Sequence, residues 1–222
     1  MIRATTTSSS KLVLCLANSM GFCYKHLVDP QQHVDTIRHV FQEAFEASEG
    51  LQQANLIGIL SEKMIQETTN QRDLLVFVAQ KRQCNDTDTD DFTTTETVVG
   101  CIIFSRLKFD CQPETNAMLL GPVSVRPAFQ NLGIGKALIQ YGVTALQEQQ
   151  GNNMDLVVVY GNPKYYSKVL DFVPITTDII PAPMPLSMPH GWQALSLRTN
   201  QQIQAIPGTS TCVMALRESQ YW

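Results

Sequence analysis

Residues 119–137 read LLGPVSVRPAFQNLGIGKA. An apolar run leads into a loop with two glycines, Gly133 and Gly135, and this loop opens a segment with helical periodicity. Glycines let the backbone approach an anion closely, and the free N–H groups at a helix N-terminus supply donors and a favourable dipole. The segment therefore predicts a strand, a loop that binds phosphate or pyrophosphate, and a helix.

Two nucleotide-binding loops fit this segment poorly. A Walker A loop requires glycine where Gln130 stands, and serine or threonine where Ala137 stands. A dinucleotide-binding fingerprint requires a third glycine, whereas Gly135 is followed by Lys-Ala-Leu. The predicted phosphate site therefore belongs to neither class.

The neighbouring segments extend this unit in both directions. A helix over Ile134–Glu148 and a strand over Asp155–Tyr160 follow the loop, which is enough chain for a parallel crossover. Such a unit places a ligand cleft at the carboxyl ends of its strands. Gly121-Pro122 inside the first strand predicts a bulge, because proline cannot donate to a strand ladder and glycine weakens it.

The rest of the chain adds two helices and several strands, which makes the predicted fold class α+β. The first helix begins at Asp29-Pro30, a capping pair, and ends at Gly50. A second helical stretch carries Leu56, Leu60 and Met64 on one face. Apolar or alternating runs predict the strands, which are Leu74–Ala79, Thr97–Phe109, Ala117–Val125, Trp192–Leu197 and Thr211–Leu216.

Composition excludes several classes of protein. The 222 residues are 44% apolar without a run long enough to span a bilayer, so we expect no membrane segment. A net charge of −4 without a basic cluster predicts that the chain does not bind nucleic acid. Six cysteines without a CxxC pair argue against zinc and favour reduced thiols in the cytoplasm. No metal site is expected.

The acidic segment 84–96 has alternating aspartates but does not match a calcium loop. In a calcium loop that starts at Asp86, the sixth position would be Asp91 rather than glycine, and the twelfth would be Thr97 rather than glutamate. We therefore predict a solvated hairpin loop.

Residues 1–20 are rich in Ser and Thr and contain no acidic residue, which predicts a leader or disordered extension, or a transit peptide to an organelle. Residues 21–222 are predicted to form a single domain.

The glycine loop and its surroundings resemble a known family. The pattern Gln-x-x-Gly-x-Gly over Gln130–Gly135, with VVVYGNPKYY over 157–166 and Phe172-Val-Pro174, is similar to the GNAT superfamily of N-acetyltransferases, in its YhbS-like branch. The similarity extends over about Tyr24 to Leu197 and is strongest from Leu119 to Pro174. It implies a mixed, mostly antiparallel central sheet that is flanked by helices and splayed at its fourth and fifth strands. It also implies acetyl-CoA as the cosubstrate.

The same resemblance implies the site residues. The backbone of Val123 and Val125 would pair with the pantetheine amides, and residues 130–136 would hold the pyrophosphate. The complete expected set for the cofactor is Val123, Ser124, Val125, Gln130, Asn131, Leu132, Gly133, Ile134, Gly135, Lys136, Ala137, Asn162 and Tyr166. Val125 is also the expected backbone donor to the thioester carbonyl.

A tyrosine on the helix after Asn162 is the implied proton donor for the leaving thiolate. We assign this role to Tyr166, the second tyrosine of the Gly-Asn-Pro-x-Tyr-Tyr pattern. The family's Gly-Phe turn is replaced here by Asp171-Phe172, and counting backward from Phe172 places Ser167 in the donor position. Tyr165, Tyr166 and Ser167 therefore remain open alternatives.

The implied activity is acetyl transfer from acetyl-CoA to a primary amine on a small molecule or a protein. The alternative is a non-catalytic acyl-CoA-binding module of the same fold. A homodimer is possible, and the acceptor is unidentified. The general base is open among Glu43, Glu46, Asp155 and the four histidines, and His190 is a candidate for the acceptor cleft.

Overall fold

A computed structural model describes residues 16–17, 21–70, 72–84, 94–149, 153–198 and 202–222. Its strands are β1 (Leu16–Ala17), β2 (Phe22–Leu27), β3 (Leu74–Cys84), β4 (Thr94–Phe109), β5 (Ala117–Val125), β6 (Leu156–Tyr160), β7 (Val173–Pro174), β8 (Trp192–Ser196) and β9 (Ser210–Thr211). Its α-helices are α1 (Val34–Glu49), α2 (Leu51–Glu67), α3 (Ile134–Gln149) and α4 (Pro163–Val169). The expected leader, apart from Leu16 and Ala17 of β1, and the acidic hairpin tip lie outside the described residues.

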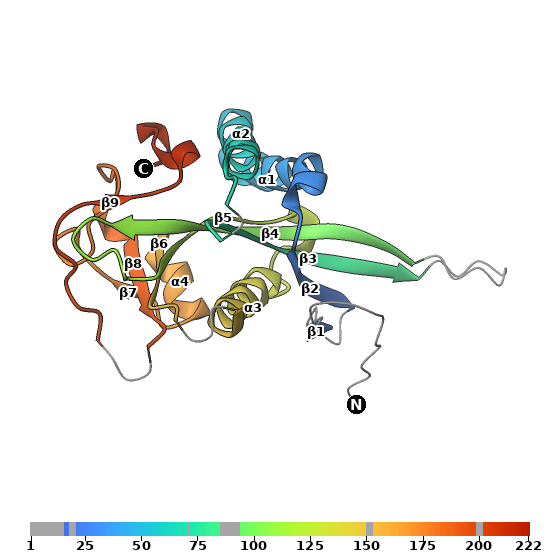
Figure 1. The fold of residues 1–222 in the computed structure, drawn as a ribbon. Helices are drawn as coiled ribbons and strands as arrows, with labels where there is room; N and C mark the ends of the chain where they lie inside the picture. Colours follow the sequence, from blue (N-terminus) through green and yellow to red (C-terminus); the bar gives the residue numbers. More distant parts are fainter. Residues whose placement is uncertain (1–15, 18–20, 71, 85–93, 150–152, 199–201) are drawn as a thin grey trace.

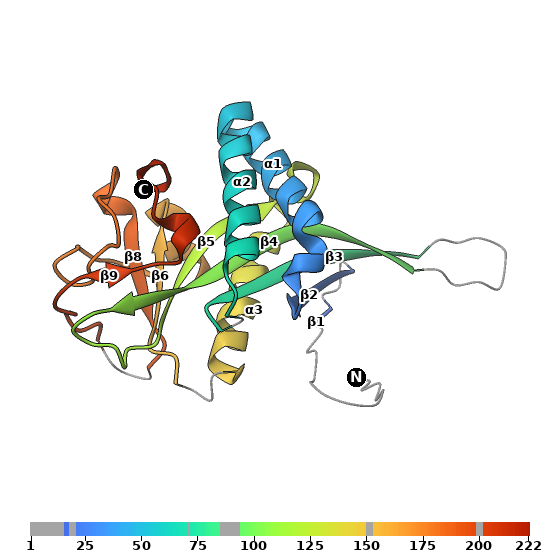
Figure 2. The same cartoon turned by 45° about the horizontal axis from the view of Figure 1, so that its top comes forward.

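The strands form one mixed sheet between two layers of helices (Figure 1). Their order is β1-β2-β3-β4-β5-β6-β8-β7, and β9 pairs with β4. Helices α1 and α2 cover one face, whereas α3 and α4 cover the other, and Figure 2 shows α1 and α2 crossing over the strands. Among the described strands, β5 and β6 form the one parallel pair, so the predicted mixed and mostly antiparallel sheet is confirmed.

Helix α1 starts slightly later than predicted. The side chain of Asp29 accepts a hydrogen bond from Gln31 N, but it caps a 3₁₀ turn, Pro30–His33, that leads into α1. The helix ends where expected, at Gly50, whose φ of 87° suits glycine. Its buried face carries Ile37, Val40, Phe41 and Ala44, as the helical periodicity of the sequence requires.

Alternating residues of the central strands supply a core on each face of the sheet. On β4, Cys101 and Ile103 belong to the core beneath α1 and α2, whereas Ile102 and Phe104 pack toward α3. This alternation fixes which face each neighbouring side chain occupies, because paired residues in adjacent strands point to the same face.

The C-terminal segment differs from the prediction of a strand over Thr211–Leu216. Only Ser210 and Thr211 form a strand, β9, and Met214–Leu216 is a 3₁₀ turn. The segment instead ends with the indole of Trp222, which stacks on Tyr160 at 5.9 Å and packs edge-on against Trp192. Long-range packing outweighs the local alternation here, because Ala215, Leu216 and Trp222 all join the core beneath α1 and α2.

The cysteines also differ in part from expectation. Cys101, Cys111 and Cys212 are free thiols, but Cys23 is disulfide-bonded, so the prediction of reduced thiols is wrong for that residue. None of the helices in the described ranges is long and apolar enough to cross a membrane. No group of three or more His, Cys, Asp or Glu side chains suited to a metal ion occurs among the described residues.

Candidate functional site

Strands β5 and β6 diverge at their carboxyl ends. They are paired from Ala117↔Leu156 to Leu120↔Val159. Beyond Leu120, β5 continues along β4 whereas β6 ends at Tyr160 and stays with β8. The gap between β5 and β6 is the splay that the resemblance implied, and the strand numbers differ from that prediction because the two-residue β1 precedes the others.

A bulge accompanies the divergence. Ile102 pairs with Val123 and Phe104 pairs with Leu120, so between these two pairs β5 contains one residue more than β4. The extra residue falls at Gly121-Pro122, and the predicted bulge is therefore confirmed. Gly121 has a φ of 152°, which favours glycine.

The open edge of β5 presents backbone groups toward the splay. Arg126 N donates to Val99 O of β4 at 2.8 Å. Because successive N–H groups of a strand point to opposite edges, Ser124 N–H also faces β4. The N–H groups of Val123 and Val125 consequently point away from β4, to the side on which β6 has diverged.

The loop between β5 and α3 forms a cradle of amide donors. Asn131 and Gly133 have left-handed backbones, with φ of 62° and 77°, and α3 begins at Ile134. The first hydrogen bond into the helix is Ala137 N to Gly133 O at 3.0 Å. Within the described residues, no acceptor takes the six N–H groups of residues 131–136. Six successive donors at a helix N-terminus are suited to an anion.

Side chains around the cradle hold it in place rather than extend it. Gln130 Nε2 donates to Val125 O at 3.0 Å, which fastens the loop to the end of β5. Lys136 is exposed. A Cβ on Gly135 would lie 2.7 Å from Tyr165 Oη and 3.5 Å from Val125 Cγ2, so the position has no room for a side chain without movement of its neighbours.

Helix α4 lies beside the cradle and carries the two tyrosines. Asn162 Oδ1 caps the helix by accepting from Lys164 N at 3.0 Å. Tyr166 points into the core and packs on Phe172 at 5.8 Å, and burial raises its pKa well above the usual value. Tyr165 is 40% exposed and turns instead toward Gly135 of α3. Ser167 is exposed.

The structure therefore gathers the expected residues around one place. The open edge of β5 at Val123 and Val125, the loop 130–136, the cap Asn162 and the two tyrosines all border the divergence of β5 and β6. The Tyr166 hydroxyl has no hydrogen-bond partner among the described residues. The side chain of Ser124 faces the α1 layer, because Ser124 pairs with Cys101, and its buried Oγ also lacks a partner in the described part of the chain.

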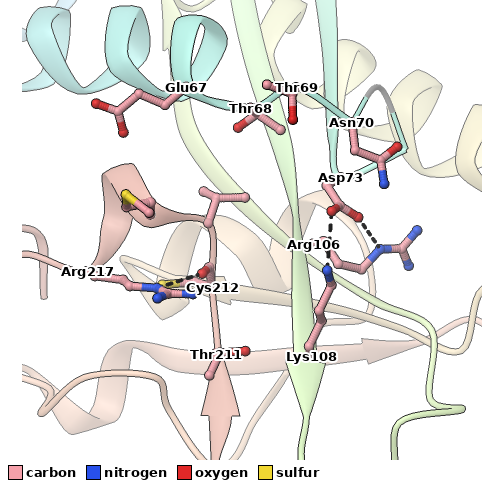
Figure 3. Close-up of a pocket in the computed structure, with 12 residues that line it drawn as sticks. Glu67, Thr68, Thr69, Asn70, Asp73, Arg106, Lys108, Thr211, Cys212 and Arg217 are labelled. Atoms are coloured by element: carbon pink, nitrogen blue, oxygen red, sulfur yellow. Dashed lines mark hydrogen bonds and ion pairs between the residues drawn. The ribbon is translucent and has the colours of Figure 1, made fainter.

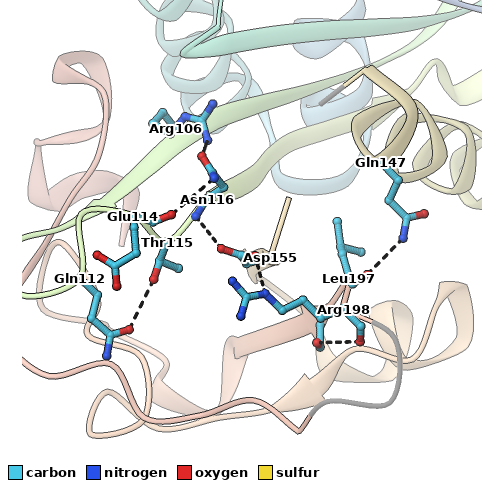
Figure 4. A network of polar contacts seen from close by, with 10 residues as sticks. Arg106, Gln112, Glu114, Thr115, Asn116, Gln147, Asp155, Leu197 and Arg198 are labelled. Atoms are coloured by element: carbon cyan, nitrogen blue, oxygen red, sulfur yellow. Dashed lines mark hydrogen bonds and ion pairs between the residues drawn. The ribbon is translucent and has the colours of Figure 1, made fainter. Parts of the chain in front are cut away.

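The candidate general bases lie at different distances from the divergence of β5 and β6. Asp155 precedes β6 and lies at the opposite end of that strand from the splay, roughly 16 Å from Tyr160 at 3.3 Å per residue. There Asp155 Oδ2 accepts from Asn116 N at 2.9 Å, and Oδ1 pairs with Arg198 Nε at 2.5 Å (Figure 4). Asp155 thus ties the starts of β5 and β6 together.

Glu43 of α1, in contrast, reaches the end of β5. Its two carboxylate oxygens lie 2.8 and 3.0 Å from Arg126 Nη1. No local signal in the sequence pairs these residues, which are 83 positions apart. Glu46 is exposed on the same helix, and His190 is exposed in a 3₁₀ turn whose Gly191 O accepts from Gly161 N, next to the end of β6.

A polar cavity of about 250 Å³ lies elsewhere, between the end of α2 and the C-terminal segment (Figure 3). Within it, Asp73 pairs with Arg106 at 3.6 Å and with Lys108 at 3.3 Å. Arg106 is aligned with Met118 at the start of β5, whereas the splay is at the other end of that strand, so the cavity is separate from the candidate site.

Comparison with known proteins agrees with this geometry. The Acetyltransferase (GNAT) family model matches residues 53–172, more than half of the chain. The chain therefore belongs to the GNAT acetyltransferase family. No curated protein matches the sequence.

Solved structures share the fold at low sequence identity. The GNAT N-acetyltransferase YhbS from Escherichia coli, solved with CoA, is 16% identical with a TM-score of 0.61, over 96% of this chain and 97% of its own. A GNAT acetyltransferase from Brucella melitensis, solved with acetyl-CoA, is 22% identical with a TM-score of 0.53, over 86% and 97%. The PaiA N-acetyltransferase from Thermoplasma acidophilum, solved with CoA, is 15% identical with a TM-score of 0.51, over 78% and 98%.

Proposed function

We propose that this protein is an N-acetyltransferase that moves an acetyl group from acetyl-CoA to a primary amine by direct transfer. The observation that carries the proposal is the row of six unpartnered amide N–H groups at residues 131–136, beside the open edge of β5. A diphosphate supplies acceptors for such a row of donors. An extended chain with two amides, such as pantetheine, pairs with an open strand edge.

The proposed cofactor residues follow from these two surfaces. Val123 and Val125 offer backbone groups to the pantetheine amides, and Ser124 lies between them. Residues 131–136 bind the pyrophosphate through their main-chain N–H groups, Gln130 holds the loop to the end of β5, and Ala137 continues the first turn of α3. Asn162 and Tyr166 border the thioester end through α4.

Direct transfer requires two proton movements. The neutral amine attacks the thioester carbon and its nitrogen loses a proton to water, while the carbon–sulfur bond breaks and the departing thiolate accepts a proton. Val125 N–H polarises the thioester carbonyl as negative charge develops on its oxygen. Tyr166 is the proposed proton donor, and the burial that raises its pKa keeps its hydroxyl protonated at neutral pH.

Titration calorimetry with acetyl-CoA, and separately with CoA, tests the cofactor. Gly135→Glu should abolish binding, because the new side chain crowds Tyr165 and adds negative charge to the cradle. Gln52→Glu, which adds the same charge at an exposed position on α2, serves as the matched control and should bind normally. Normal binding by a folded Gly135→Glu variant would contradict the pyrophosphate assignment.

A non-catalytic acyl-CoA-binding module of the same fold is the second candidate. It is favoured by the end of α4, where the chain leaves the helix at Leu170 in an extended conformation and continues through Asp171 instead of the family's glycine. It is also favoured by the burial of Tyr166 in the core. Release of CoA that depends on an added amine would exclude this candidate, whereas cofactor binding without such release across a broad amine panel would support it.

The remaining parts of the proposal concern partners and location. The net charge of −4 supports an acceptor other than nucleic acid, and size-exclusion chromatography with light scattering would test for a homodimer. We keep the cytoplasm as the compartment on the basis of the scattered thiols, although the disulfide at Cys23 is unusual there. Mass spectrometry of the protein, with its free thiols alkylated inside the source cells, shows whether Cys23 is oxidised there. Reduced Cys23 would support the cytoplasm, and oxidised Cys23 would count against it.

A further inference from the structure

Tyr165 links α4 to the amide cradle of α3. Its hydroxyl oxygen lies 2.7 Å from the position that a Cβ on Gly135 would take, which places the hydroxyl beside the backbone of Gly135. This placement is possible because residue 135 has no side chain. Within the described residues, the Tyr165 hydroxyl has no hydrogen-bond partner.

The orientation of Tyr165 follows from how α4 is anchored. Asn162 caps the helix, Pro163 occupies its first turn, and Tyr166 is buried against Phe172. Adjacent residues on a helix point about 100° apart, so Tyr165 must leave the core when Tyr166 enters it. The ring of Tyr165 stands perpendicular to that of Tyr166, with centroids 5.1 Å apart, which supports its position at the cradle.

The unpartnered groups identified around the cradle, among the described residues, are hydrogen-bond donors. The N–H groups of residues 131–136 are donors only. Burial raises the pKa of Tyr165, so its hydroxyl keeps its proton at neutral pH. The carboxylate of Glu43, at the end of β5, is paired with Arg126. A ligand that satisfies all of these groups must present acceptors, as the oxygens of a diphosphate do.

We propose that the Tyr165 hydroxyl donates a hydrogen bond to a pyrophosphate oxygen of acyl-CoA and closes the amide cradle from the α4 side. This inference rests on the proposed function. It makes Tyr165 a positioning residue for the diphosphate, and it leaves the proton donation to the thiolate with its neighbour Tyr166. The adjacent tyrosines thus contact different groups of the same cofactor.

Binding of two probes to Tyr165→Phe tests the proposal. CoA is titrated by calorimetry, and S-acetyl-pantetheine, which lacks the diphosphate, is titrated by NMR. We expect the variant to bind CoA about tenfold more weakly, the effect of one hydrogen bond to a charged group. The affinity for S-acetyl-pantetheine should stay unchanged. Tyr221→Phe removes the same hydroxyl from the C-terminal segment and is the matched control.

Two results would overturn the inference. Unchanged CoA affinity in Tyr165→Phe shows that the hydroxyl does not contact the diphosphate. An equal loss for CoA and S-acetyl-pantetheine shows that Tyr165 acts through the fold or at the thiol end. Failure of the wild-type protein to bind CoA would instead refute the proposed function itself, so the two failures are distinguishable.

Discussion

Glu43 of α1 and Arg126 at the end of β5 form an ion pair in which one guanidinium nitrogen, Nη1, lies within 3.0 Å of both carboxylate oxygens. The pair connects the helical layer over one face of the sheet to the strand that leads into the phosphate loop. The side chains are 47% and 24% exposed, so solvent screens their attraction.

Removal of this pair should therefore affect stability only slightly. We expect Glu43→Gln to lower the free energy of unfolding by less than about 1 kcal/mol, as for other partly exposed ion pairs. Urea denaturation measures the change, and Glu218→Gln, which breaks the exposed pair with Lys63, is the matched control. A loss several times that of the control would mean that Glu43 anchors α1 more strongly than its exposure indicates.

Asp155 is expected to be structural. Replacement by alanine removes the acceptor of Asn116 N–H and the partner of Arg198, at a cost of about 2 kcal/mol of stability. Acetyl-CoA affinity should not change, because the residue lies at the far end of β6. Denaturation and calorimetry on the same sample measure these two effects, with exposed Asp178→Ala for comparison. Lost cofactor binding in a folded Asp155→Ala variant would place this carboxylate nearer the site than the structure does.

Gly142 is required where α3 packs on β4. A Cβ there would lie 2.7 Å from Phe104 Cε2 and 2.9 Å from Ile102 Cδ1, both fully buried. We expect Gly142→Ala to destabilise the protein by about 1–3 kcal/mol despite the better helix propensity of alanine. Gly58→Ala on α2 is the comparison, because the three atoms nearest its Cβ would all belong to the flexible side chain of Gln42. Thermal melts that rank Gly58→Ala as the more damaging change would contradict the packing between α3 and β4.

Ionisation of Cys212 should reduce stability at high pH. Burial raises the pKa of this thiol from 9.0 to about 11 in the folded protein. The folded state therefore holds the proton more tightly than the unfolded state, and this contribution is complete below pH 9 and lost as the pH rises from about 9 to 11. The stability difference between wild type and Cys212→Ala should narrow over that range in urea titrations. A constant difference would show that the thiol titrates alike in the two states.

Tyr166→Phe tests the proton donor. If an amine acceptor is found, we expect turnover to fall about tenfold or more, with little change in acetyl-CoA affinity, because the hydroxyl acts only on the leaving thiolate. Steady-state CoA release and calorimetry separate these quantities. Tyr165→Phe is the complementary variant, since it is expected to weaken the cofactor and to preserve turnover at saturation. Unchanged turnover in Tyr166→Phe would remove this residue from the mechanism.

Local patterns were sufficient for much of this protein. The glycine spacing from Gln130 to Gly135 specifies a loop that runs into a helix, since backbone conformation there depends on the residues themselves. The apolar runs before and after α3 predict a crossover, and Gly121-Pro122 predicts the bulge, because proline cannot donate within a ladder wherever it stands. These features depend on neighbours in the chain and were confirmed.

Contacts between distant segments were not predictable in the same way. Thr211–Leu216 alternates like a strand, yet most of it is a 3₁₀ turn and coil whose Ala215 and Leu216 join the core beneath α1 and α2. Tyr165 and Tyr166 are chemically identical neighbours, and the tertiary packing places Tyr166 in the core against Phe172 and Tyr165 beside Gly135. Glu43 meets Arg126 across 83 positions. Side-chain chemistry and local conformation are properties of the chain, whereas the direction in which a side chain points depends on what the folded neighbours leave unfilled.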